Sequence, residues 1–166
     1  MKRIGLLSDT HGYMDERILH HLRRCDEIWH AGDIGDLKVM EELGEIAPIR
    51  AVYGNIDGEK ARISYPLNNI FELEGIKCFI THIAGRPGKY PSRVKEIIEK
   101  EEPDIFVCGH SHILLVKKDP KSGLLHLNPG AAGRHGFHKM RTLIRFEIDS
   151  GMVQHPEIIE LGKRSS

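Results

Sequence analysis

The chain has 166 residues, enough for one compact domain with a substantial core but too few for two large domains. Its 24 Lys and Arg residues balance 24 Asp and Glu residues, so the composition gives no general attraction to nucleic acid or to an anionic membrane. The three cysteines lack C-x-x-C spacing, which argues against a disulfide framework or a zinc ribbon, and the absence of a long apolar run or a signal peptide predicts a cytoplasmic protein with no membrane contact.

Short apolar runs alternate with helical patterns through the first two thirds of the chain, which is typical of a layered α/β domain. Strands are expected at 3–9, 27–33 and 49–55 and helices at 14–27 and 37–45, the first helix with Asp15 as N-cap. A hairpin over 70–82 should turn at Glu74 and Gly75. A helix over 91–102 should begin near Pro91 and end before Pro103.

The last third of the chain is expected to contain strands only. They are predicted at 104–110, 113–118, 124–128, 141–149 and 152–161. No repeat, linker or low-complexity segment interrupts the sequence. We therefore expect a single domain over residues 1–160, followed by a short polar tail over 161–166.

Polar residues follow the predicted strands at their carboxyl ends. The segments SDTHG, AGD, YGN, THI, CGHSH and NPG each place Asp, His or Asn there, usually beside Gly. In open α/β sheets this edge is where ligands bind, because its loops converge on a rigid scaffold. The six strand ends therefore predict one polar cluster.

The chemistry of this cluster suits divalent metal ions. Its candidate ligands are Asp9, His11, Asp33, Asn55, His82, His110 and His112. Carboxylate, imidazole and amide groups together suit borderline ions such as Mn, Fe, Zn, Ni or Co, and the absence of thiolates argues against a structural zinc. Seven ligands are too many for one catalytic ion with an open position, so they predict two ions that share a carboxylate, a device for phosphoryl chemistry.

Close spacing along the chain supports the same interpretation. Residues i and i+2 of an extended segment point to one side, so Asp9 with His11, and His110 with His112, can reach one site. Each candidate alone has an ordinary alternative as a turn residue or a polar strand end, and a lone H-x-H is a weak signal. Independent accidents at successive strand ends are much less probable together.

The motifs D-x-H, G-D, G-N, H and G-H-x-H, in this order, resemble those of the calcineurin-like metallophosphoesterase superfamily. The short length, the NPG segment and the closing run of strands resemble its small prokaryotic phosphodiesterase branch. The resemblance implies a four-layer α/β/β/α sandwich with mixed sheets. It also implies two divalent ions, with Mn preferred over Ni, Co, Zn or Fe.

Site roles follow from the same resemblance. Asp9, His11 and His112 would hold the first ion, Asn55, His82 and His110 the second, and Asp33 would bridge both. A metal-bridging hydroxide would attack phosphorus directly, with Asp33, Asn55 and His82 as the central catalytic ligands.

Two positions depart from the family pattern. Ile56 stands where many members have a His that assists the leaving group, and the candidates to replace it are His135 and Asp57, whose ordinary alternatives are a solvated loop His and a turn Asp. Ile83 stands where the family usually has Gly, so a positive φ would be strained there and the loop would depend on Gly85 and Gly88. His30 is expected to support a ligand by a hydrogen bond.

The leading hypothesis is a dimetal phosphodiesterase or phosphatase acting on a small or nucleotide-derived phosphate ester. The alternative is a non-catalytic scaffold that binds proteins, because the vacuolar sorting subunit of the retromer coat resembles the same fold. A nuclease finds no support in the neutral charge or in any basic groove. A homo-oligomer is compatible with this interpretation.

Overall fold

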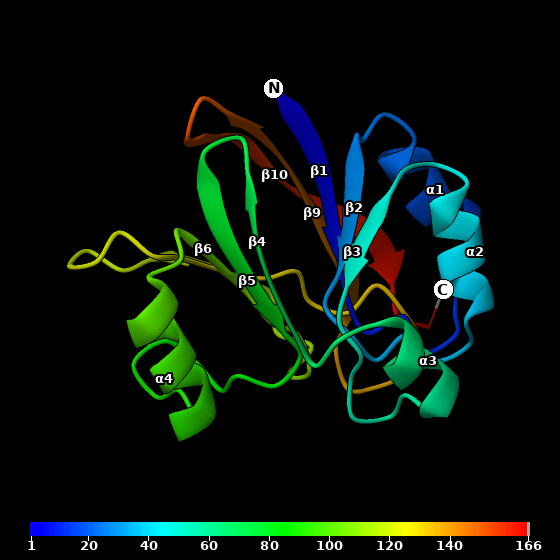
Figure 1. Cartoon of the computed structure of the whole chain (residues 1–166). Coiled ribbons are helices and arrows are strands. Elements are labelled where there is room, and N and C mark those ends of the chain that lie inside the picture. Colours follow the sequence, from blue (N-terminus) through cyan, green and yellow to red (C-terminus); the bar gives the residue numbers. More distant parts are fainter. Residues whose placement is uncertain (166) are drawn as a thin grey trace.

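Two five-stranded mixed sheets pack face to face, and helices cover the outer face of each (Figure 1). The computed structural model describes residues 1–165. Helices α1 (Glu16–Leu22) and α2 (Lys38–Gly44) lie on one side, and α4 (Ser92–Glu101) lies on the other. This arrangement confirms the expected four-layer α/β/β/α sandwich.

The first sheet has the strand order β10-β9-β1-β2-β3. Its strands are β1 (Lys2–Leu7), β2 (Glu27–His30), β3 (Ile49–Ala51), β9 (Met140–Asp149) and β10 (Met152–Lys163). The first three are parallel, and β9 pairs antiparallel with both β1 and β10. The carboxyl ends of β1, β2 and β3 therefore meet at one edge.

The second sheet has the order β4-β5-β6-β8-β7. Its strands are β4 (Asn68–Leu73), β5 (Ile76–Thr81), β6 (Ile105–Val107), β7 (Leu115–Lys118) and β8 (Leu125–Asn128). The central strands β5, β6 and β8 are parallel, with antiparallel β4 and β7 at the two edges. Glu74 and Gly75 both have positive φ in the β4–β5 turn, as the hairpin prediction requires.

Three apolar clusters hold the layers together. Alternate residues of β1 divide between two of them: Ile4 and Leu6 face the second sheet, whereas Leu7 faces α1 and α2. Between the sheets, Trp29 of β2 packs edge-on against Phe71 and Phe146. The third cluster seats Val94 of α4 on the outer face of β5 and β6.

Helix ends agree with the sequence signals in most places. The Asp15 carboxylate accepts the backbone N–H of Ile18 at 3.0 Å, as expected of an N-cap, but α1 ends at Leu22 rather than near residue 27. Helix α4 ends with Glu102 in a left-handed conformation before Pro103. The short helix α3 (Glu59–Ser64) was not predicted, because it buries only Ala61 and so has no apolar periodicity.

The chain end differs from the expected tail. Strand β10 continues to Lys163, and Leu161 is buried in the cluster that contacts α1 and α2. The first three residues of the predicted 161–166 tail are therefore part of the sheet, and Ser166 lies outside the described residues. Among residues 1–165, no helix is long and apolar enough to cross a membrane.

Candidate metal centre

All seven predicted ligands come together where strands of both sheets end, at the lower edge in Figure 1 where β3 leads into α3. Asp9 and His11 follow β1, Asp33 follows β2 and Asn55 follows β3. His82 directly follows β5, and His110 and His112 follow β6. The parallel packing of these strands is what gathers residues that lie up to about a hundred positions apart in sequence.

The side chains form two groups that can each hold a metal ion. The first is Asp9, His11 and His112, and the second is Asp33, His82 and His110; within each group the ligand atoms all lie within 4.8 Å of one another. The Asn55 amide oxygen lies 3.1 Å from His110 Nδ1 and so belongs with the second group. Asp33 Oδ2 lies 3.2 Å from His82 Nε2 and 3.5 Å from His11 Nε2, which puts this oxygen between the two groups.

Several candidate ligand atoms are buried without a hydrogen-bond partner in residues 1–165, and this bears on whether the two groups suit cations. Asp9 Oδ1, His11 Nε2 and His82 Nε2 are buried, and each lacks a hydrogen-bond partner within residues 1–165. His82 Nδ1 lies 2.7 Å from the carbonyl oxygen of Ala31, which can only accept, so Nδ1 carries the proton and Nε2 presents its lone pair to the centre. Asp9 Oδ1 and His82 Nε2 thus present electron pairs to the centre without a hydrogen-bond partner among the described residues, which fits ligands of a divalent ion.

The electrostatics of the centre also favour a cation. Burial opposes charge on His82, yet the carboxylates of Asp33 and Asp9 outweigh it and raise the pKa of this histidine. Burial likewise opposes ionisation of Asp33, but the imidazole of His82, whose Nε2 lies 3.2 Å from Asp33 Oδ2, keeps the pKa of the carboxyl low. The pKa of His11 is lowered, chiefly by burial. The second group therefore contains an ionised carboxylate, and the negative charge of the carboxylates favours a positive charge at this position.

The ligand loops have an unusual backbone. Five of the seven ligands have left-handed φ values between 45° and 70°: Asp9, His11, Asp33, His110 and His112. The i, i+2 pairs therefore meet through left-handed turns, and the extended geometry expected from the sequence is wrong. Non-glycine residues in this region cost about 1–2 kcal/mol each, and such strain clusters at functional sites.

Asp9 and Asp33 are held so that one oxygen of each faces the centre. Asp9 Oδ2 accepts from Ser8 Oγ at 2.6 Å and from the backbone N–H of His110 at 3.1 Å, which leaves Oδ1 toward the histidines. Asp33 Oδ1 accepts the backbone N–H of Ile56 at 3.1 Å. A Cβ at Gly54 would collide with this same Asp33 oxygen, so the close approach of the loop after β3 requires glycine.

His30 supports the ligand loops, although it contacts no ligand side chain. Its Nδ1 accepts the backbone N–H of Gly32 at 3.1 Å, and its Nε2 lies 3.0 Å from Thr10 Oγ1, which in turn donates to the carbonyl of Ile34 at 2.9 Å. Burial lowers the pKa of His30 to about 4, so it is neutral, with Nε2 as donor to Thr10. The expected hydrogen bond to a ligand is thus replaced by bonds to the residues that flank Asp9 and Asp33.

Asn128 supports the GHSH loop, a role that the sequence did not reveal. Its amide nitrogen lies 3.2 Å from the Gly109 carbonyl and 3.1 Å from Ser111 Oγ. Its amide oxygen accepts the backbone N–H of Gly130 at 3.0 Å. The only sequence signal was the NPG segment at a strand end.

The two auxiliary candidates occupy very different places. Asp57 is buried, and its carboxylate accepts three backbone N–H bonds, from Ile34, Gly35 and Gly54, at 2.8–3.1 Å. His135 is exposed, and its ring stacks on the ring of His11 with centroids 4.6 Å apart. Asp57 therefore joins two ligand loops, whereas His135 faces the space above the first group.

Ile83 causes no strain, because it is absent from the positive-φ residues of the described chain. Gly85 and Gly88 do have positive φ, in agreement with the expected flexibility of this loop. The Ile83 carbonyl accepts a hydrogen bond from Arg93 of α4 at 2.6 Å, which ties the loop to the helix.

An open cavity of about 500 Å³ lies over the centre. Its polar lining includes Asp33, Asn55 and the histidines His11, His110, His112, His135 and His138. The His138 ring packs edge-on against His112 with centroids 5.1 Å apart. The cavity is large enough for a small phosphate ester.

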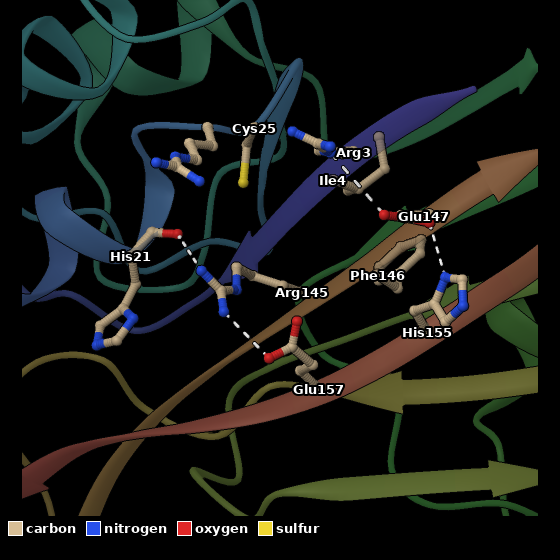
Figure 2. A pocket seen from close by; sticks show the side chains of 10 residues that line it. Arg3, Ile4, His21, Cys25, Arg145, Phe146, Glu147, His155 and Glu157 are labelled. Atoms are coloured by element: carbon tan, nitrogen blue, oxygen red, sulfur yellow. Dashed lines mark hydrogen bonds and ion pairs between the residues drawn. The ribbon is translucent and has the colours of Figure 1, made fainter.

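A second cavity, of about 220 Å³, lies where α1 meets β1, β9 and β10 (Figure 2). Arg145 donates to Glu157 and to the backbone carbonyl of His21, both at 3.1 Å. Glu147 pairs with His155 at 2.8 Å and with Arg3 at 3.8 Å. Because Arg3 and Arg145 are already paired with Glu147 and Glu157, the cavity is better explained as an ion-pair network than as a second reactive site.

Comparison with known proteins agrees with the site. Residues 1–151 match the calcineurin-like phosphoesterase superfamily domain. The chain belongs to this superfamily. A probable metallophosphoesterase of Methanocaldococcus jannaschii is 31% identical over 137 residues, which cover 77% of this chain and 67% of the relative. A phosphodiesterase of the same organism is 30% identical over 149 residues, covering 77% of this chain and 82% of that protein.

Solved structures share the fold at lower identity. An archaeal phosphodiesterase superposes with a TM-score of 0.77 at 23% identity, covering 95% of this chain and 99% of that one. Vacuolar protein sorting protein 29 of Chaetomium thermophilum superposes with a TM-score of 0.76 at 14% identity, covering 98% and 100%. The fold of this calcineurin-like phosphoesterase thus occurs both in a protein described as an enzyme and in a protein described as a sorting protein.

Proposed function

We propose that this phosphoesterase is a dimetal-dependent phosphodiesterase that hydrolyses a small or nucleotide-derived phosphate ester. The observation that carries the proposal is the pair of ligand groups that meet at Asp33 beneath an open cavity. The matched family and the relative named as a phosphodiesterase support the same reaction class.

In this proposal Asp9, His11 and His112 would hold one ion, Asn55, His82 and His110 would hold the other, and Asp33 would contribute to both sites. Two bound divalent ions lower the pKa of a coordinated water and clamp phosphate oxygens during in-line displacement. The mixed imidazole, carboxylate and amide set suits Mn, our preferred ion, and also Ni, Co, Zn or Fe.

The chain's own residues prepare the site. His30, Asp57 and Asn128 fix the ligand loops through backbone hydrogen bonds, so little reorganisation is needed when substrate binds. His135 is the better candidate to assist the leaving group, because it is exposed in the cavity. Asp57 is a poorer candidate because its two oxygens already accept three N–H bonds.

The alternative is a non-catalytic protein-binding scaffold. Structural neighbours described as vacuolar protein sorting proteins favour it at the level of fold. Seven intact ligand positions with unpartnered buried atoms support the enzyme.

The test is hydrolysis of bis(p-nitrophenyl) phosphate and of p-nitrophenyl phosphate after chelator treatment and after addition of Mn, Ni, Co or Zn. We expect the chelated protein to be inactive, and the metal-loaded protein to cleave the diester faster than the monoester. Faster cleavage of the monoester would replace the diesterase assignment with a phosphatase. Bound metal without hydrolysis of either ester would favour the scaffold.

A further inference from the structure

The mouth of the metal-centre cavity is apolar although its floor is polar. Phe137 lines this cavity and is fully exposed, and the neighbouring lining residues Ile113 and Ile56 are 66% and 48% exposed. Single exposed apolar side chains are ordinary on protein surfaces. Three at the mouth of one functional cavity indicate a ligand with an apolar face.

The loop that carries Phe137 is fixed to the metal centre. His135 stacks on His11, and His138 packs edge-on against His112. Gly136 lies so close to the His112 ring that a Cβ there would collide with it. The backbone carbonyl of His138 accepts from Arg164 Nε at 2.9 Å. The backbone that carries Phe137 is therefore held beside the metal centre by contacts of the residues on both sides of it in sequence.

A third cavity, of about 500 Å³, lies next to the metal-centre cavity on the other side of Phe137. It shares Phe137 and His138 with the metal-centre cavity, and Lys139, Lys163 and Arg164 also line it. A ligand that reaches across Phe137 thus passes from the metal centre to a basic surface. This order of features matches a molecule with a phosphoester, a flat ring and a further anionic group.

We propose that Phe137 determines substrate specificity by stacking on the nucleobase of a nucleotide phosphodiester, with a further phosphate of the substrate facing Lys139 and Arg164. This inference rests on the proposed phosphodiesterase function and names its substrate class. The neutral net charge agrees with a short nucleotide rather than a long nucleic acid. Base–aromatic stacking accounts for roughly a tenfold difference in binding for each base.

Two esters with the same leaving group provide the test: the p-nitrophenyl ester of thymidine 5′-monophosphate, and methyl p-nitrophenyl phosphate. Phe137→Ala should lower the ratio of kcat/KM for the nucleotide ester to that for the methyl ester about tenfold, and Phe137→Trp should keep it. Met152→Ala is the matched control, because Met152 is also an exposed apolar residue. It begins β10 at the edge of the sheet opposite the metal centre, near the start of β1, where Ile148 pairs with Lys2. An unchanged ratio in Phe137→Ala would overturn the inference.

Fluorescence separates this inference from the proposed function. In the metal-loaded Phe137→Trp protein, the new indole is the exposed one, since Trp29 is fully buried. Thymidine 5′-monophosphate should quench it, whereas methyl phosphate should not. Quenching by both or by neither would overturn the stacking, whether or not the protein hydrolyses esters. Absence of hydrolysis by the unaltered protein, together with selective quenching, would instead overturn only the proposed function.

Discussion

At the scale of single residues, the main departure from the family pattern is Ile56, which stands where many members have a histidine. Ile56 carries no proton to donate, and its backbone N–H is used by Asp33. His135 reaches the same cavity from the loop after β8, in stacking contact with His11. The sequence named both His135 and Asp57 as candidates to replace the family imidazole, and the packing of the loops distinguishes them, because His135 lines the cavity whereas Asp57 is buried.

His135→Ala should therefore act selectively on poor leaving groups. Hydrolysis of an alkyl phosphodiester should fall by about 10²-fold, whereas release of p-nitrophenolate, which needs no proton, should change less than about threefold. Adding Ile56→His to this variant should restore part of the loss. Equal losses for both esters, measured as kcat/KM, would contradict a leaving-group role for His135.

His155→Ala is the control for this comparison. His155 is an exposed histidine of β10 that pairs with Glu147, and it lines the cavity in Figure 2 rather than the metal-centre cavity. It should leave both rates unaltered.

At the scale of elements, the loops after the strands position the ligands through contacts with one another. Asp57 joins the loop after β2 to the loop after β3, and Gly54 touches Asp33 between them. Hydrogen bonds between loops also hold left-handed ligands in place: the His11 N–H donates to the Asp33 carbonyl at 3.0 Å, and the His110 N–H donates to the Asp9 carboxylate at 3.1 Å.

Gly54→Ala should lower metal affinity because its Cβ would displace Asp33 Oδ1. We expect at least about a tenfold loss, equivalent to about 1.4 kcal/mol, in a competition with a fluorescent chelator. Gly58→Ala, in the same β3–α3 segment, is the matched control, since a Cβ there meets nothing within 4 Å. Equal affinities of the two variants would show that Asp33 does not need this close approach.

Strand β8 contributes a different property, sensitivity to acid. Burial lowers the pKa of His126 to about 4, while its Nδ1 lies 2.8 Å from the Tyr90 hydroxyl and its Nε2 lies 3.6 Å from Cys108 Sγ. In the unfolded chain this histidine takes up a proton near pH 6.5, whereas in the folded protein it stays neutral until about pH 4. The free energy of unfolding should therefore decrease as the pH falls from about 6.5 toward 4.

His126→Gln should therefore flatten the pH dependence of stability in that range. The slope of the free energy of unfolding should fall by as much as about 1.4 kcal/mol per pH unit, the effect of one proton. Urea denaturation at several pH values measures it. His20→Gln, on the exposed face of α1, is the control, and the same slope in both variants would rule out His126 as the acid-sensitive group.

At the scale of the whole molecule, the sequence predicted the layers and the clustering of the seven polar residues better than it predicted the local geometry. Strand ends rich in Asp, His and Asn located the centre, and the family resemblance supplied the sandwich. The left-handed ligands and the support from Asn128 were missed, and His30 was expected to bond a ligand rather than Thr10 and Gly32, because these features depend on contacts between distant loops. Helix α3 and the last residues of β10 were missed because they have weak apolar periodicity.

The whole-molecule account depends on two ions that share Asp33. The most direct test is to titrate Mn into the chelated protein while bound metal and hydrolysis of bis(p-nitrophenyl) phosphate are measured in the same samples. The account predicts that two ions bind per chain and that activity rises mainly when the second ion binds. It also predicts that the Asp33→Ala variant binds fewer than two ions and does not gain this activity. Full activity with one bound ion, or two bound ions and full activity in Asp33→Ala, would contradict it.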